Sequence, residues 1–213
     1  SGLWEAQKLG DKHGITLIHG CEFYYEREND GKNGHLVVLA KDNVGLSNMF
    51  KLQERAYVEN FYRKPRINWE MLQEHHEGLI VTSACLASTF CQYIIDGKVD
   101  LAKGWAKKFK ALFGDDFYLE VQPNMLPEQH LVNKTIVRIS DELDIPIVAT
   151  NDVHYKFEDD CFPHEVMLAM QVNKKMSDEN RFKFDTEDFW LKSNEEMIET
   201  FKKKPFEYKN NIE

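Results

Sequence analysis

The sequence lacks the long apolar run that a membrane-spanning helix needs. No stretch of about 18 apolar residues occurs in its 213 residues, so we expect no membrane partner. The first residues also lack the basic-then-apolar pattern of a secretory signal. Its four cysteines have neither zinc-finger spacing nor the density of a disulfide framework. These absences favour a globular protein of the reducing cytoplasm.

An excess of positive charge is also missing. The formal net charge is -9, whereas non-specific nucleic-acid binding depends on Lys and Arg side chains that neutralise phosphates. The clusters Lys107–Lys108 and Lys202–Lys204 are small and are typical of solvated helix faces or ends. This chain is therefore expected to bind DNA poorly by itself, and if DNA is a partner, we expect another part of a larger protein to hold it.

Short apolar segments alternate with amphipathic ones, without repeats or low-complexity tracts. This alternation predicts an α/β fold with a parallel sheet or barrel. About five central strands can be counted, fewer than the roughly eight that close a barrel. The first predicted helix has no strand before it, so we expect the first strands to lie upstream. The predicted strands fall within residues 15–25, 35–40, 79–84, 117–121 and 145–155.

Capping signals and apolar periodicity locate the predicted helices. Asp42 or Asn43, Asn68, Pro127 and the capping box Ser193–Glu196 each mark a helix start. The predicted helices cover residues 3–12 (ending near Gly14), 43–57, 69–72, 86–95, 101–113 (ending at Gly114), 127–143 and 164–172, and a last one follows Ser193. Their predicted inner faces include Leu46, Met49, Phe50 and Tyr57, and then Leu131, Val132, Ile136, Ile139 and Leu143.

Asp152 and His154 follow the most apolar predicted strand, Ile145–Tyr155. Residues i and i+2 of a strand point to the same side, so this carboxylate and this imidazole would project together. An oxygen ligand beside a nitrogen ligand suits zinc, manganese or iron. The alternative is a capped strand end, in which Asp152 accepts from loop N–H groups and His154 packs under Tyr155.

Three further residues at strand margins carry groups that bind metals. Glu22 follows Gly20-Cys21, His35 begins the next predicted strand, and Cys85 ends the strand 79–84. Each has a structural alternative: the solvent side of an edge strand for Glu22, a surface histidine for His35 and a buried apolar thiol for Cys85. For His164, packing is favoured over metal binding. Because a barrel gathers its strand ends at one mouth, Glu22, Cys85 and the pair Asp152/His154, which all fall where predicted strands finish, together predict a multi-metal hydrolytic centre.

No nucleophile elbow, P-loop or dinucleotide fingerprint is present. Several segments instead resemble, in the same order and over nearly the whole chain, a known domain family. This is the polymerase-and-histidinol-phosphatase (PHP) domain, in the version at the N-terminus of the bacterial replicative DNA polymerase III alpha subunit. The segments are Ile18–Tyr24, His35–Lys41, Phe61–Ile67, Glu77–Ala87, Phe117–Val121, Leu126–Gln129, Val148–Tyr155 and Phe189–Met197.

The resemblance implies a distorted, TIM-like (β/α)7 barrel with up to roughly three divalent metal ions at its mouth. By motif position its ligands would be Glu22, His35, Cys85, Asp152 and His154. The family's first two motifs, His-x-His and Asp-His-Gly, do not occur, so we expect a barrel lacking its first two strands. It would hold metal weakly or in an altered geometry, with fewer ions than an intact domain or none. Residues 1–175 would form the partial barrel, and 176–213 the connection towards a polymerase palm that is absent.

The resemblance also implies a function. The parent chain would be a DNA-directed DNA polymerase that works in replication, and its PHP domain a metal-dependent phosphoesterase or 3′-5′ exonuclease. Implied partners are DNA, reached through the rest of the polymerase, and replicase subunits such as the proofreading exonuclease and the sliding clamp. Two alternatives stay open: an inactive scaffold barrel, and a free-standing phosphoesterase of the same superfamily.

Overall fold

The computed structural model describes residues 2–27, 31–124 and 126–203. It divides into two compact units, one of Ser1–Leu119 with Leu143–Pro146 and one of Glu120–Glu142 with Ile147–Glu213. The predicted boundary at residue 175 stays a prediction, and the last residue of the cluster Lys202–Lys204 lies outside the described residues. Within the described part, no helix is both long and apolar enough to cross a membrane.

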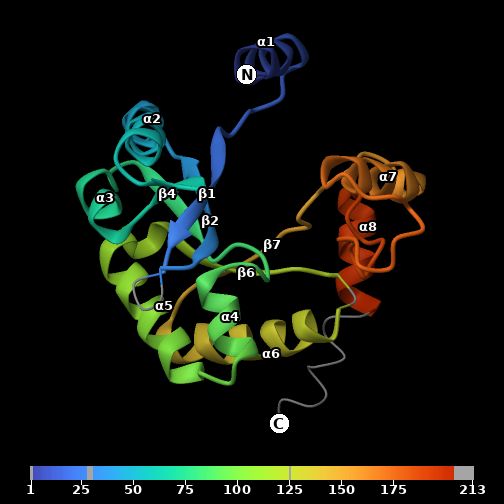
Figure 1. Cartoon of the computed structure of the whole chain (residues 1–213). Coiled ribbons are helices and arrows are strands. Elements are labelled where there is room, and N and C mark those ends of the chain that lie inside the picture. Colours follow the sequence, from blue (N-terminus) through green and yellow to red (C-terminus); the bar gives the residue numbers. More distant parts are fainter. Residues whose placement is uncertain (1, 28–30, 125, 204–213) are drawn as a thin grey trace. The chain divides into compact units, whose positions relative to one another are not determined.

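Helices and strands alternate along the chain, which confirms the predicted α/β class (Figure 1). The helices are α1 (Leu3–His13), α2 (Asn43–Val58), α3 (Trp69–Glu74), α4 (Thr89–Ile95), α5 (Val99–Phe113), α6 (Pro127–Leu143), α7 (Cys161–Gln171) and α8 (Asn194–Lys203). The strands are β1 (Gly20–Glu26), β2 (Asn33–Ala40), β3 (Phe61–Tyr62), β4 (Lys64–Ile67), β5 (Leu79–Thr82), β6 (Phe117–Val121) and β7 (Ile147–Ala149). The single-turn 3-10 helices are η1 (Gly114–Asp116) and η2 (Glu158–Asp160).

The sheet of the first unit has the strand order β3-β4-β1-β2-β5-β6. Its pairs β4–β1 and β5–β6 are parallel, but β1–β2 and β2–β5 are antiparallel. The expectation of a parallel sheet is therefore wrong at β1–β2, because the short link from Glu26 to Asn33 leaves no room for a helical crossover. In the second unit β7 lies beside the end of β6, where the Thr150 N–H donates to the Val121 carbonyl over 3.1 Å.

Side chains alternate strictly across the hairpin formed by β1 and β2. Phe23, Tyr25, Leu36 and Val38 are buried on one face, and the residues between them stay partly exposed on the other. The buried face packs on helices that carry aromatic side chains. Phe109 of α5 contacts Tyr25 at a ring distance of 5.8 Å and stacks on Trp105 at 3.8 Å. This apolar layer fixes the register of the hairpin, and the register decides which residues face outward.

The predicted helix ends are confirmed where a side chain or a glycine sets them. The side chains of Asp42 and Asn68 each accept a hydrogen bond from the third helical N–H. Ser193 and Glu196 form the reciprocal capping box that begins α8. Gly14 ends α1 in the left-handed conformation, with φ of 66°.

Parts of the predicted inner faces are wrong. Phe50 and Tyr57 of α2 and Leu131 of α6 are exposed, whereas Met49 and Leu52 are buried in α2. Phe50 and Tyr57 are seven residues apart and share one stripe of the helix, but β2 and β4 contact the neighbouring stripe. A wide apolar surface on a helix predicts that the helix packs against the core. It does not predict which of two adjacent stripes of the helix is covered.

The predicted strand Ile145–Tyr155 is mostly not a strand, because β7 ends at Ala149. Beyond it the chain is held by a distant segment. The His154 N–H donates to the Phe189 carbonyl over 2.9 Å, and the Leu191 N–H donates to the Tyr155 carbonyl over 3.0 Å. Asp152 adopts a left-handed backbone with φ of 39°. The sequence pattern had suggested that strand periodicity makes Asp152 and His154 project together. Because the backbone there is not a strand, strand periodicity does not orient these side chains.

Candidate metal centre

Glu22 and His35 are brought together by the register of the β1–β2 hairpin. Glu22 pairs with Val37 and Tyr24 pairs with His35, so Glu22 and His35 are diagonal neighbours on one face. The His35 Nδ1 atom lies 2.8 Å from the Glu22 Oε1 atom. The Tyr24 ring contacts the imidazole edge-on at 5.4 Å and limits how it can rotate.

Cys85 reaches the same face from the turn after β5. Thr82 at the end of β5 pairs with Val37, and the chain then reverses through Ala84, which has a left-handed φ of 57°. Two backbone hydrogen bonds fix this turn over β2: the His35 N–H donates to the Ala87 carbonyl over 3.3 Å, and the Ser88 N–H donates to the Cys85 carbonyl over 2.9 Å.

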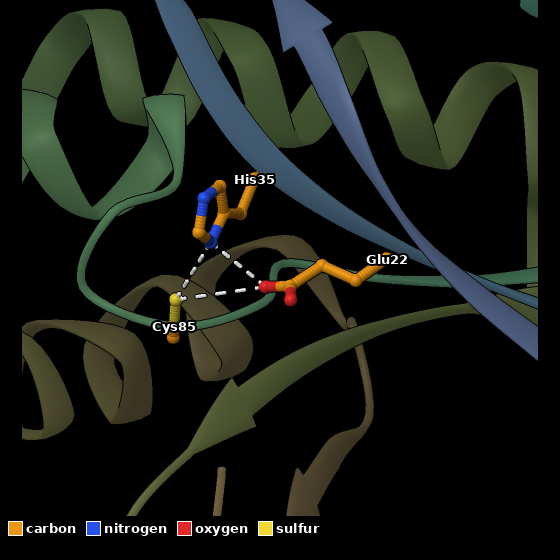
Figure 2. Close-up of side chains that lie close together, drawn as sticks. All are labelled: Glu22, His35 and Cys85. Carbon is orange, nitrogen blue, oxygen red and sulfur yellow. Dashed lines mark hydrogen bonds and ion pairs between the residues drawn. The ribbon is translucent and has the colours of Figure 1, made fainter. Parts of the chain in front are cut away.

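The three donor atoms form a compact triangle (Figure 2). Cys85 Sγ lies 3.4 Å from His35 Nδ1 and 4.0 Å from Glu22 Oε1. Ligand atoms at two corners of a tetrahedral zinc site are separated by about 3.5 Å, given bond lengths of about 2.0 to 2.3 Å. The triangle therefore fits one face of such a site after small side-chain movements. A thiolate among the ligands favours zinc or iron over magnesium or calcium.

The predicted convergence of Glu22 and Cys85 is thus present, together with His35, which the resemblance implied as a ligand. The strand-end reason holds for Cys85, which follows β5, but not for Glu22. Glu22 is the third residue of β1 and His35 lies near the start of β2, so neither follows a strand end. The alternative for Glu22 holds in part: its side chain is exposed to solvent, but β1 lies between β4 and β2 in the sheet and is not an edge strand. The side-chain exposures, 47% for Glu22 and 29% for His35, leave the triangle open to solvent.

Asp152 and His154 lie in the second unit and face each other, with Oδ1 and Nε2 3.5 Å apart. The imidazole packs against Phe184 at 4.8 Å and Phe189 at 5.1 Å. The alternative, in which it packs under Tyr155, stays a prediction. The pair therefore offers an oxygen and a nitrogen ligand side by side. That it meets Glu22, His35 and Cys85 at one rim stays a prediction.

His164 of α7 lies beside this pair. Its ring is stacked on Phe184 and its centroid is 5.8 Å from that of His154. Partial burial lowers the pKa of His164, and the neighbouring His154 lowers it further. These aromatic contacts agree with the packing role that was favoured for His164.

A buried polar network in the second unit was not predicted. Glu120, at the end of β6, is 5% exposed and accepts hydrogen bonds from the Thr150 hydroxyl and, over 3.2 Å, from the Gln122 amide. Gln129 and Asn133 of α6 extend the network, with the Asn133 amide donating to the Gln122 carbonyl over 2.7 Å. Its sequence signal is the pair of polar residues Glu120 and Gln122 at the end of the apolar strand Phe117–Val121.

Comparison with known proteins identifies the family. A PHP domain profile matches residues 2–124, which is more than half of the chain. The chain belongs to the PHP domain family. The α/β fold described above agrees with the PHP barrel fragment that the resemblance implies.

Similar full-length proteins agree with this family. The chain is 38% identical over 210 residues to a DNA polymerase III subunit alpha of Treponema pallidum, covering 94% of this chain and 18% of that protein. A Deinococcus radiodurans protein of the same name is 43% identical over 173 residues, with 80% and 13% covered. A Borreliella burgdorferi one is 38% identical over 220 residues, with 99% and 19% covered. The chain thus spans less than a fifth of the length of these relatives.

Proposed function

We propose that this PHP domain chain is part of a DNA polymerase III alpha subunit and that it hydrolyses phosphodiesters with bound metal. The observation that carries the proposal is the triangle of Glu22, His35 and Cys85, whose donor atoms all lie within 4.8 Å of one another. Polymerisation of DNA would belong to the parent chain, as the names of the similar proteins suggest. As part of a bacterial replicase the chain would work in the cytoplasm.

The three side chains would supply three different kinds of metal ligand. The Glu22 carboxylate supplies a hard oxygen ligand, the His35 Nδ1 atom a nitrogen ligand and the Cys85 thiolate a soft ligand. A divalent cation held by them would supply Lewis acidity and a bound water of lowered pKa. The exposed side of Glu22 leaves room for a phosphate group. No general base beyond the ligands is proposed.

Asp152 and His154 would serve as further ligands. Their facing oxygen and nitrogen atoms, 3.5 Å apart, support this role, as does the fixed backbone hydrogen bond from His154 to Phe189. The substrate we propose is the 3′ end of DNA, so the reaction would be a metal-dependent 3′-5′ exonuclease reaction. Zinc, manganese and iron all suit this mixed donor set.

Metal content and 3′ trimming of a mismatched primer, measured on the same samples, test the proposal. We expect the purified chain to bind zinc, manganese or iron stoichiometrically and to trim the primer. His35→Asn should lose both properties, because it removes the nitrogen donor at the centre of the triangle. The matched control is His13→Asn, at the exposed end of α1. In the parent polymerase, Asp152→Ala with His154→Ala should abolish trimming and leave polymerisation largely intact.

Two outcomes would overturn the proposal. Stoichiometric metal without trimming, in the chain and in its parent, would leave a scaffold barrel with a structural metal. Hydrolysis of small phosphate esters without any action on DNA would point to a free-standing phosphoesterase. Partners beyond DNA, namely the proofreading exonuclease and the sliding clamp, would be reached through the parent chain.

A further inference from the structure

The hairpin formed by β3 and β4 presents a basic and aromatic surface on a chain whose net charge is -9. Its first four residues, Phe61, Tyr62, Arg63 and Lys64, are all exposed. The exposures of the two aromatic residues, 57% for Phe61 and 59% for Tyr62, are large for such side chains. Exposed aromatic groups beside unpaired cations are what single-stranded nucleic acids bind, since bases stack on rings while phosphates pair with Lys and Arg.

The buried base of this hairpin is fixed by Arg66, whose charge is satisfied within the protein. Arg66 lies 3.3 Å from the Glu26 carboxylate and donates to the Asn60 side chain over 2.9 Å and to the Gly31 carbonyl over 3.1 Å. Arg63 and Lys64, in contrast, form no ion pair with any carboxylate in the described part of the chain. Their charges are therefore available to an outside partner.

Arg63 occupies the tip of the hairpin between the paired residues Tyr62 and Lys64. Its backbone is left-handed, with φ of 61°, a conformation that glycine adopts without steric conflict and other residues rarely adopt. The conformation of the turn therefore does not explain why an arginine occupies this position. The Arg63 guanidinium lies 5.5 Å from the Tyr62 ring centre, so the cation and the exposed ring form one surface.

Contacts within the first unit connect this surface to the candidate metal centre. The Lys64 Nζ atom lies 5.7 Å from the centre of the Tyr24 ring. The Tyr24 ring also contacts His35, at a ring distance of 5.4 Å. Tyr24 lies on the same face of β1 as Glu22, because the two residues are two positions apart in one strand. Lys64 is therefore linked through Tyr24 to His35 of the metal-binding triangle.

We propose that the β3–β4 hairpin binds single-stranded DNA and leads its end to the triangle of Glu22, His35 and Cys85. Arg63 and Lys64 would contact phosphates, and Tyr62 and Phe61 would stack on bases. The role given to this DNA binding rests on the proposed function, but the binding itself needs no metal. The overall negative charge disfavours non-specific binding of DNA, so the binding would depend on this local patch.

Fluorescence anisotropy of a labelled oligothymidylate of about 12 nucleotides, in the range of site sizes of single-strand binders, tests the binding. The main variant is Arg63→Gly with Lys64→Ala, in which glycine suits the left-handed backbone and the fold is kept. We expect its affinity to fall about 10-fold or more. The slope of log affinity against log salt should decrease by about 1.4, because each phosphate contact contributes about 0.7 for single strands.

The matched control is Lys107→Ala with Arg138→Ala, which removes the same charge from exposed positions outside the hairpin. It should bind like the wild-type chain. Tyr62→Leu keeps an apolar side chain but removes the ring, and we expect it to weaken binding about 5-fold or more with an unchanged salt slope. Equal affinity of the main variant and its control would overturn the proposal.

Metal content separates this inference from the proposed function. The hairpin variants should keep the metal of the wild-type chain, and His35→Asn should still bind the oligonucleotide although it loses metal. A poly-glutamate competitor gives a further check. If it binds the hairpin more tightly than the oligothymidylate does, an acidic protein segment is the partner and the DNA proposal is wrong.

Discussion

The His35 imidazole is held between two neighbours on one face of β1: the Glu22 carboxylate at 2.8 Å and the Tyr24 ring, whose centre lies 5.4 Å from that of the imidazole. This arrangement follows from the hairpin register, in which Tyr24 is directly opposite His35 and Glu22 is diagonal to it. The register itself is fixed by the buried residues of the other face, such as Phe23 and Leu36. The ligand geometry is therefore set before any metal binds, at the level of strand pairing.

Glu22→Gln should weaken metal binding by about 100-fold or more, since loss of even an outer partner of a ligand costs about 10- to 100-fold. Glutamine keeps the shape of the side chain and can still bond to His35, so the stability of the metal-free chain should hardly change. Competition with a chromogenic chelator measures the affinity. Glu70→Gln, an exposed acid at the start of α3, is the control. Equal losses in both variants would exclude Glu22 as a ligand.

Cys85→Ser should change the kind of metal that is held. Replacing sulfur by oxygen removes the soft ligand, so zinc affinity should fall more than manganese affinity. Cobalt(II) substitution provides the readout, because a thiolate ligand gives a charge-transfer absorption that a hydroxyl does not. Cys161→Ser in the second unit is the control and should keep the absorption. A charge-transfer band that persists in Cys85→Ser would show that another thiol binds the metal.

The sequence predicted the local elements well, because their signals are local. Asp42 and Asn68 mark helix starts through side chains that cap within three residues. Glycine at positions 14 and 114 marks helix ends, where the backbone has a positive φ. The same holds for the α/β class, which depends on alternation along the chain and not on contacts between distant segments.

The residues of the candidate site were predicted from the sequence, but the way in which the fold brings them together was not. Glu22 and Cys85 were selected as strand-end residues and His35 as the start of a strand, yet Glu22 and His35 meet through an antiparallel register that no spacing in the sequence specifies. The segment after β7 shows the same limit. Asp152 and His154 look like strand residues, but the backbone there pairs with Phe189–Leu191, and apolar periodicity carries no information about so distant a partner.

Gly34→Ala should destabilise the chain by about 1 to 3 kcal/mol, the usual cost of overpacking. A Cβ atom at this position would lie 2.5 Å from Thr89 Oγ1 and 2.7 Å from the Thr89 backbone nitrogen, so the start of α4 would have to move. Because Gly34 precedes His35, metal affinity should fall as well.

The control for Gly34→Ala is Gly104→Ala within α5, where a Cβ atom would meet nothing within 4 Å. It should stabilise the chain by about 0.5 to 1 kcal/mol, since alanine favours the helix. Urea unfolding followed by circular dichroism measures both variants. A Gly34→Ala variant as stable as the wild type would mean that β2 and α4 are not in close contact.

His75, the residue that ends α3, should make the chain less stable in mild acid. Burial lowers its pKa in the folded chain, and the positive charges of Arg55 and Lys51 lower it further. The unfolded chain therefore takes up the proton first as the pH falls below about 6.5. Stability is unaffected above that pH and decreases as the pH falls from there through the lower pKa of the folded state, because the unfolded state then binds more protons.

Comparison of His75→Gln with the wild type at about pH 7.5 and pH 5.5, on either side of the histidine pKa, measures this effect. We expect the loss of stability between the two pH values to be smaller in His75→Gln, as judged by the urea midpoint. His13→Gln, at the exposed end of α1, serves as the control and should retain the wild-type loss. The same loss in His75→Gln and the wild type would show that protonation of His75 is not linked to folding. A larger loss in His75→Gln would mean that the charged imidazole stabilises the fold, contrary to its position beside Arg55 and Lys51.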